Sequence, residues 1–272
     1  MPSLSFLFKE SWQLYKEKFL ALAFIILLPI ILIYLLNLVL PISEINALTE
    51  FYINSLGNPD AEFNIGFDIF WYFVLYSVLA AALFLLSFIA MIFNLWKNSG
   101  VIESYSLAFK NLLPFIWMTI LASAVKMGGF LLAIIPGIII SIWFIFSGFT
   151  LIEENKKGMK ALLLSREYIR GHWWAVLGRI ILLTLIVVAI SALISLIPDS
   201  ENEFMKIAII VILQLIITPA FMVYMYAMYK QLKKIKSGID KENLERSRGF
   251  LILAGVIGLV APSLLFTWIF FL

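Results

Sequence analysis

Seven long apolar stretches constrain the fold of this chain more than any other feature of its sequence. A helix needs about 20 mostly apolar residues to cross the roughly 30 Å hydrocarbon core of a bilayer. The stretches are Phe19–Leu40, Asp68–Trp96, Phe115–Ile134, Gly137–Ile152, Trp173–Ile197, Phe204–Tyr229 and Phe250–Leu272. They predict an all-α, polytopic integral membrane helix bundle of about seven transmembrane helices.

Composition excludes several classes of protein. Of the 272 residues, 63% are hydrophobic and 14% are charged, whereas soluble domains have about 45–50% apolar and about 25% charged residues. A soluble globular enzyme and a disordered chain are therefore both excluded. The chain has no cysteine and one histidine, His172, so we expect no metal site and no catalytic residues. The sequence also predicts no cofactor and no nucleic-acid partner.

Lysine and arginine alternate between the connections that join the apolar stretches. The segment before the first stretch and the connections 97–114, 153–172 and 230–249 are basic, two of the others are acidic, and the one at Pro136-Gly137 is uncharged. Cytoplasmic loops carry an excess of lysine and arginine. We therefore expect a plasma-membrane protein with a cytoplasmic N-terminus and an external C-terminus. The small net charge of +3 then results from a basic cytoplasmic face and an acidic external face whose charges largely cancel.

Three basic segments show the pattern of an amphipathic helix. Apolar residues recur at helical spacing over residues 4–19, 101–112 and 161–169, with charged residues opposite. Such helices lie in the headgroup plane with their basic side chains toward anionic lipid. The expected partners are the bilayer and the anionic headgroups of its cytoplasmic face, with a membrane-protein partner as an alternative. Trp12, Trp173 and Trp174 are predicted interfacial anchors, because tryptophan favours the membrane interface.

Together these elements suggest a repeated unit of an interfacial helix, a span out and a span back. The copies are residues 1–96, 97–155 and 156–230, which form one membrane domain, and parallel repeats of this kind occur in transporters. The alternative is that any polytopic protein with basic loops shows the same layout. Residues 231–249 form a basic cytoplasmic connection, and residues 250–272 form an appended span. Within that span, Ala254 and Gly258 form a small-xxx-small pattern, which we expect to pack within the chain.

The third and fourth stretches are separated only by Pro136-Gly137, a dipeptide typical of a turn. We expect these two residues to form the tight turn of a transmembrane hairpin. The alternative is that the two stretches form one re-entrant element.

Residues 135–143 read Ile-Pro-Gly-Ile-Ile-Ile-Ser-Ile-Trp, and they are followed by Glu153-Glu154, Gly158, Ser165, Gly171 and Trp173-Trp174. This pattern resembles the membrane domain named after glycerophosphoryl diester phosphodiesterase, together with related bacterial membrane-protein families of unknown function. The resemblance covers roughly residues 1–230 and is most specific from Pro136 to Trp174. It implies the membrane domain only. Phosphodiesterase chemistry needs paired histidines and clustered carboxylates around a metal, and this chain has a single histidine.

Lys126 is the strongest anomaly, since it lies near the middle of the third stretch. A lysine at the bilayer centre costs about 2.5–3.5 kcal/mol on insertion scales, and such residues mark functional sites or internal pairs. Gln214 and Asn94 are candidate partners in a polar intramembrane site, as are Ser147 and Ser191. The alternative is that Lys126 extends toward one interface.

Three functions remain open. The interfacial helices favour a non-enzymatic membrane module for membrane organisation, anchoring, or lipid or partner binding. Lys126 and the prolines inside the spans favour a small transporter or pore with a polar cavity. An intramembrane enzyme acting on lipid comes last, because no paired titratable groups are visible.

Overall fold

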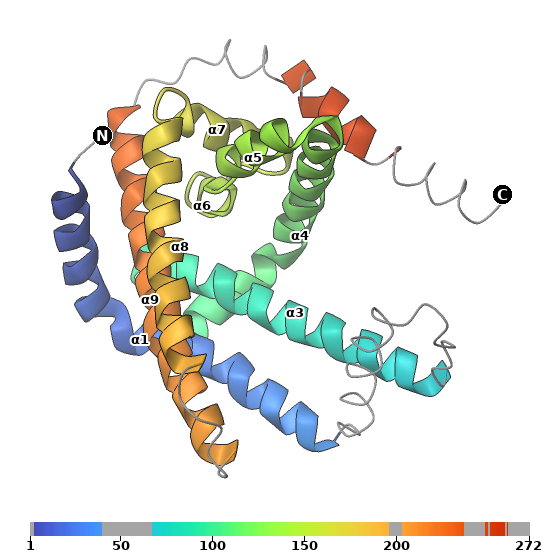
Figure 1. Cartoon of the computed structure of the whole chain (residues 1–272), viewed down its shortest axis with the longest axis vertical. Helices are drawn as coiled ribbons and strands as arrows, with labels where there is room; N and C mark the ends of the chain where they lie inside the picture. Colours follow the sequence, from blue (N-terminus) through green and yellow to red (C-terminus); the bar gives the residue numbers. More distant parts are fainter. Residues whose placement is uncertain are drawn as a thin grey trace.

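The computed structural model describes residues 3–39, 67–195, 203–236, 248–249, 251–258 and 260. Within these residues the chain is all-helical and has no strand, as the sequence predicts (Figure 1). The helices are α1 (Leu4–Val39), α3 (Phe67–Lys97), α4 (Val101–Leu132), α5 (Ile134–Trp143), α6 (Ser147–Glu153), α7 (Met159–Ile169), α8 (Trp173–Ser195) and α9 (Glu203–Ile235). Residues 251–258 are also helical.

Six segments of the described chain are long and apolar enough to cross a membrane. They are Leu4–Leu36, Trp71–Lys97, Val101–Leu132, Ile134–Glu153, Trp173–Ala192 and Ala208–Ile235. Each contains or overlaps one of the first six predicted stretches. The seventh stretch, residues 250–272, lies mostly outside the described residues, so the count of about seven spans stays a prediction.

The first two predicted interfacial helices are continuous with the spans that follow them. Residues 4–19 form the beginning of α1, and residues 101–112 form the beginning of α4. Figure 1 shows that α1 bends into two arms. The first arm packs along α9, where the rings of Phe8 and Tyr224 lie 5.2 Å apart and Gln231 Nε2 donates to Glu10 Oε2 over 2.7 Å. The repeat of three units stays a prediction, because the helix bounds differ among the units.

The third predicted interfacial helix is the separate helix α7, but its apolar stripe does not lie on lipid. Ala161, Leu162, Ser165 and Ile169 are all fully buried against the rest of the protein. The amphipathic pattern is the same for a helix on a membrane surface and for one on a protein core. Here the core covers the stripe.

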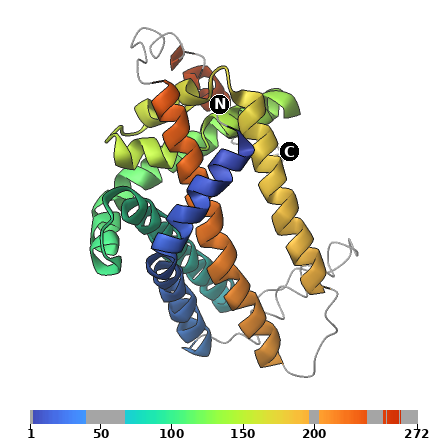
Figure 2. The same ribbon diagram turned by 90° about the vertical axis from the view of Figure 1, so that its left-hand side faces the viewer.

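The chain reverses between α4 and α5 at Ala133, whose backbone is extended with φ −175° and ψ 163°. Pro136 and Gly137 lie just beyond the reversal, in the first turn of α5, where proline costs no helical hydrogen bond. The turn is therefore three residues earlier than expected. In both views this junction lies toward the same end of the molecule as α7 and the C-terminal end of α9 (Figures 1 and 2). That position favours the re-entrant alternative for α4 and α5.

The fourth predicted span is broken into α5 and α6 by a turn at residues 144–146. Ser165 of α7 bonds both sides of this break, because its hydroxyl accepts from Phe146 N at 3.2 Å and donates to Trp143 O at 2.7 Å. Irregular backbone inside a membrane protein is tolerated where protein groups satisfy it. The buried hydroxyl of Ser165 therefore holds α5, α6 and α7 together.

The small-xxx-small pattern packs within the chain, as expected. A Cβ added at Gly128 of α4 would lie 1.8 Å from the carbonyl oxygen of Ala254, and one added at Gly258 would lie 1.9 Å from that of Ala124. Only glycine permits two backbones to approach this closely. Residues 251–258 are therefore fixed against α4, which places Arg248 close to the loop before α7.

Candidate functional site

The structure does not assemble the predicted polar site around Lys126. Lys126 is half-buried on α4 and makes no hydrogen bond or ion pair with the residues that the structure describes. Asn94 is buried, and its amide donates to the carbonyl of Ser99 at 2.6 Å, so it stabilises the connection between α3 and α4. Gln214 is half-buried on α9. Each residue lies in a different helix, and no described contact joins them.

The predicted tryptophan anchors occupy two places. Trp12 is exposed on the first arm of α1, where it stacks on Tyr15 and lies 5.7 Å from Lys16 Nζ. Trp173 and Trp174 open α8 and form an edge-to-face pair with ring centroids 4.6 Å apart. Trp174 is exposed, whereas Trp173 packs on the core.

A buried polar cluster, not expected from the sequence, fixes the end of α6. Glu154 Oε1 accepts hydrogen bonds from the Tyr168 and Tyr229 hydroxyls at 2.6 and 2.7 Å. Lys233 Nζ lies 2.8 Å from Glu153 Oε1 and 3.5 Å from Glu154 Oε1. Burial, and then the hydrogen bond to Glu154, raise the pKa of Tyr168 above its usual range. Its hydroxyl therefore stays protonated and donates to the carboxylate. We call these five residues the carboxylate–tyrosine cluster.

Two positive φ angles shape the loop that leaves this cluster. Asn155 has φ 52° and Gly158 has φ 55° with ψ −130°, a conformation that side chains rarely adopt. The amide of Lys156 returns to the carbonyl of Thr150 at 3.4 Å. The cluster anchors one end of the loop and α7 begins at the other, so Lys156 and Lys157 are presented from a fixed backbone.

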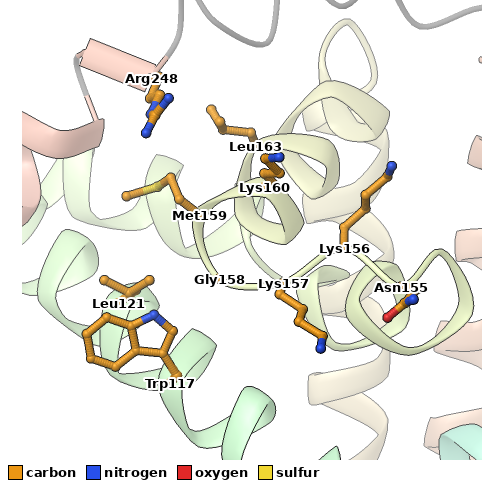
Figure 3. Close-up of a pocket in the computed structure, with 10 residues that line it drawn as sticks. All are labelled: Trp117, Leu121, Asn155, Lys156, Lys157, Gly158, Met159, Lys160, Leu163 and Arg248. Carbon is orange, nitrogen blue, oxygen red and sulfur yellow. The ribbon is translucent and has the colours of Figure 1, made fainter.

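A basic pocket of about 590 Å³ lies between this loop, α4 and the chain before residue 251 (Figure 3). Its apolar residues are Trp117 and Leu121 of α4 and Met159 and Leu163 of α7, and Asn155 and Gly158 complete the loop side. Four cationic residues line it as well: Lys156, Lys157, Lys160 and Arg248. Among the described residues, no acidic residue lines it. In Figure 3, Arg248 extends toward the space above Trp117.

The lysines around this end of the molecule fall into two groups. Lys233 is held by Glu153, and Lys236 donates to the carbonyls of Glu167 and Arg170 at the end of α7. Burial is the main cause that lowers the pKa of Lys236. Lys156, Lys157 and Lys160 are exposed and have no hydrogen-bond or ion-pair partner for their ammonium groups in the described part of the chain. The first group stabilises the fold, and the second is available to an anion.

The N-terminus of α7 adds to this positive potential. Gly158 caps the helix without a side-chain hydrogen bond, and α7 runs for 11 residues from Met159. The first turn of a helix carries partial positive charge and favours anions. The pocket therefore combines an apolar wall with a cationic rim, which is an arrangement suited to an anionic amphiphile.

The sequence predicted the charges of this pocket but not the pocket itself. Lys156, Lys157 and Lys160 belong to the basic connection 153–172, which in the sequence indicates orientation and a helix face toward anionic lipid. Trp117 and Leu121 lie about 40 residues before them, inside a predicted span. Asn155 and Gly158 flank two lysines, and residues of these types are typical of a loop with positive φ angles. The local sequence does not show which helix packs against this loop.

In its described residues the chain is all-helical, and several of its helices are long and apolar enough to cross a membrane. Comparison with protein-family models, with curated proteins and with solved structures finds no match. The resemblance to the membrane domain named after glycerophosphoryl diester phosphodiesterase therefore stays a prediction.

Proposed function

We propose that this protein is a non-enzymatic membrane module that binds anionic lipid at the basic pocket. The observation that carries the proposal is the set of three lysines without partners above an apolar wall. Basic pockets between membrane helices bind anionic lipid headgroups, and a lysine near such a surface contributes about 1 kcal/mol. The apolar wall of Trp117 and Leu121 would contact the part of the lipid next to its headgroup.

The expected orientation supports the same function. Lysine and arginine favour the cytoplasmic side of a membrane protein, so the pocket would face the cytoplasmic leaflet of a bacterial plasma membrane. A transport function centred on Lys126 has less support, because Lys126 lines neither this pocket nor the groove described below.

Native mass spectrometry of the purified protein tests the proposal. We expect phosphatidylglycerol to bind more tightly than phosphatidylcholine with the same acyl chains. The double substitution Lys157→Gln and Lys160→Gln should lower phosphatidylglycerol affinity about thirtyfold, which corresponds to about 2 kcal/mol for two lysines. Lys110→Gln is the matched control, since Lys110 is also exposed on this chain but lies outside the pocket.

Competition with inorganic phosphate separates the headgroup from the whole lipid. Displacement of lipid by millimolar phosphate would show that the site recognises the phosphate alone. Equal binding of the two lipids, or an equal loss in the Lys110→Gln control, would contradict the proposal.

A further inference from the structure

A second cavity lies between the first arm of α1, α8 and α9, on elements that do not line the basic pocket. It is a groove of about 300 Å³, at the lower end of the range of about 300–1,000 Å³ for small-molecule sites. Most of its walls are apolar, with Leu183, Ile186 and Ile190 from α8 facing Ile217 and Ala220 from α9. The inference below does not rest on the proposed function of the basic pocket.

The groove exists because α8 packs on the protein only over its first half. Val176 is fully buried, and Trp173, Leu177, Ile180 and Leu183 pack on the core. Farther along, Leu185 and Ile186 are exposed. Figure 2 shows α8 standing apart from α9 along its length. The apolar space between the two helices is therefore available to a chain-like apolar ligand.

One end of the groove is polar. Ser11 of α1 and Tyr224 of α9 both line it and are buried, with exposed fractions of 7% and 3%. Neither hydroxyl oxygen has a hydrogen-bond partner in the part of the chain that the structure describes. A buried hydroxyl without a partner is costly, and each such group in a folded protein calls for an explanation. A bound ligand with polar atoms at this end would supply the missing partners.

A cation lies at the same end. Arg179 precedes Leu183 by four residues on α8, so the two side chains share a helix face with Ile186 and Ile190. Arg179 is buried and lies near Tyr224. The stripe along α8 thus runs from a buried guanidinium to three aliphatic side chains.

The direction of this polarity matches that of a bilayer lipid. Phe8 contacts Tyr224 and Tyr15 donates to the carbonyl of Ile216, so α1 runs antiparallel to α9. Ser11, Tyr224 and Arg179 consequently lie nearer the end of the bundle where Lys233 and Lys236 are found, and the aliphatic walls lie farther from it. A phospholipid has its phosphate at the interface and its acyl chains toward the bilayer centre, in the same order.

The geometry points to a lipid site in which this groove holds one acyl chain of an anionic phospholipid. The acyl chain lies between α8 and α9. The hydroxyls of Ser11 and Tyr224 donate to the ester or phosphate oxygens, and Arg179 complements the phosphate charge.

The test uses the purified full-length protein in mild detergent, with phosphatidylglycerol retention measured by native mass spectrometry. Ile186→Trp fills the groove and should abolish the retained lipid. Leu185→Trp is the matched control, since Leu185 is the neighbouring residue, is exposed and does not line the groove. Tyr224→Phe should lower retention while leaving thermal unfolding unchanged, because the hydroxyl makes no hydrogen bond to the described part of the protein.

Loss of lipid in Ile186→Trp and Tyr224→Phe with retention in Leu185→Trp would support the site. Unchanged retention in both groove variants would overturn it, as would equal loss in Leu185→Trp, which would indicate only non-specific lipid around the helices. A dimer that carries no lipid would overturn it as well, because the occupant would then be a second copy of the chain. Loss confined to the Lys157→Gln and Lys160→Gln double variant would overturn the groove site and assign the lipid to the basic pocket.

Thermal unfolding of each variant shows whether a loss of lipid reflects misfolding. Tyr224→Phe keeps the test valid if Ile186→Trp does not fold.

Discussion

The segment α5–α6 and the helix α8 are both strongly apolar in sequence, but the first is buried in the protein and the second is mostly exposed. Both contain 20-residue stretches apolar enough to cross a membrane, Ile134–Glu153 and Trp173–Ala192. Over an apolar run of 18 residues, 56% of the first stretch is buried in protein, whereas only 11% of the second is buried. Apolar character alone therefore does not determine whether a stretch faces protein or lipid.

Small residues and polar contacts account for the difference. A Cβ added at Gly137 of α5 would meet the ring of Phe130 at 2.3 Å, and one added at Gly148 of α6 would meet Phe115 at 3.2 Å. A Cβ added at Gly178 of α8 would meet nothing within 4 Å. Helices in membranes associate through close packing and hydrogen bonds, since lipid is as apolar as their side chains. The α5–α6 segment has both kinds of contact, whereas most of α8 has neither.

The largest expected contrast is in exposure to lipid. A lipid-soluble diazirine, photolysed with the wild-type protein in liposomes, should label residues 181–190 of α8 strongly and residues 147–152 of α6 almost not at all. Peptide mass spectrometry measures the labelling, and the unfolded protein in dodecyl sulfate provides the reference for equal access. Equal labelling of both segments in the folded protein would remove the distinction between them.

The next largest effect should come from the carboxylate–tyrosine cluster. Glu154→Leu leaves the buried Tyr168 and Tyr229 hydroxyls without an acceptor. Each orphaned group costs about 1–3 kcal/mol, so we expect the free energy of unfolding to fall by about 2–6 kcal/mol for the two hydroxyls. Unfolding in dodecyl sulfate, followed by circular dichroism, measures the change. Glu103→Leu, at an exposed position of α4, should change it by less than about 0.5 kcal/mol, and an equally large loss there would refute the explanation.

A pair of glycine substitutions compares the packed and open regions directly. Gly128→Ala places a Cβ against the carbonyl oxygen of Ala254, and overpacking of this kind costs about 1–3 kcal/mol. Gly178→Ala on α8 has open space and should gain up to about 1 kcal/mol from helix propensity. The same unfolding assay measures both, and the comparison fails if the two substitutions have the same sign.

The smallest expected effect is a dependence on alkaline pH. The pKa of Tyr168 is raised in the folded protein, mainly by burial and then by its hydrogen bond to Glu154. Above about pH 10, the usual tyrosine value, the unfolded chain loses this proton while the folded chain keeps it. The stability contributed by Tyr168 is complete below that pH and falls as pH rises, by up to about 1.4 kcal/mol per pH unit. Unfolding at pH 9 and pH 11 should show a smaller decrease in Tyr168→Phe than in the wild type.

The sequence predicted the helical elements well because length and hydropathy are local properties. Six predicted stretches coincide with helices, and Ala254 with Gly258 predicted a close helix contact that the structure contains. The candidate site was harder to predict from the sequence. Lys126 stood out by its position in a span, but the structure brings no described partner to it. The lysines that line the pocket look like ordinary loop residues in the sequence. Only the tertiary structure places Trp117 and Arg248 beside them.

The sequence by itself thus determined that this chain forms apolar helices and where most of them begin and end. The tertiary structure decided that α7 turns its stripe onto the core, that α5–α6 is enclosed, and that α8 leaves a groove. The physical reason is that transfer out of water favours a lipid tail and a protein interior almost equally. The choice between lipid and protein interior therefore depends on complementary shape, as at Gly128 and Gly258. It also depends on hydrogen bonds that satisfy buried polar groups, as at Ser165 and Glu154.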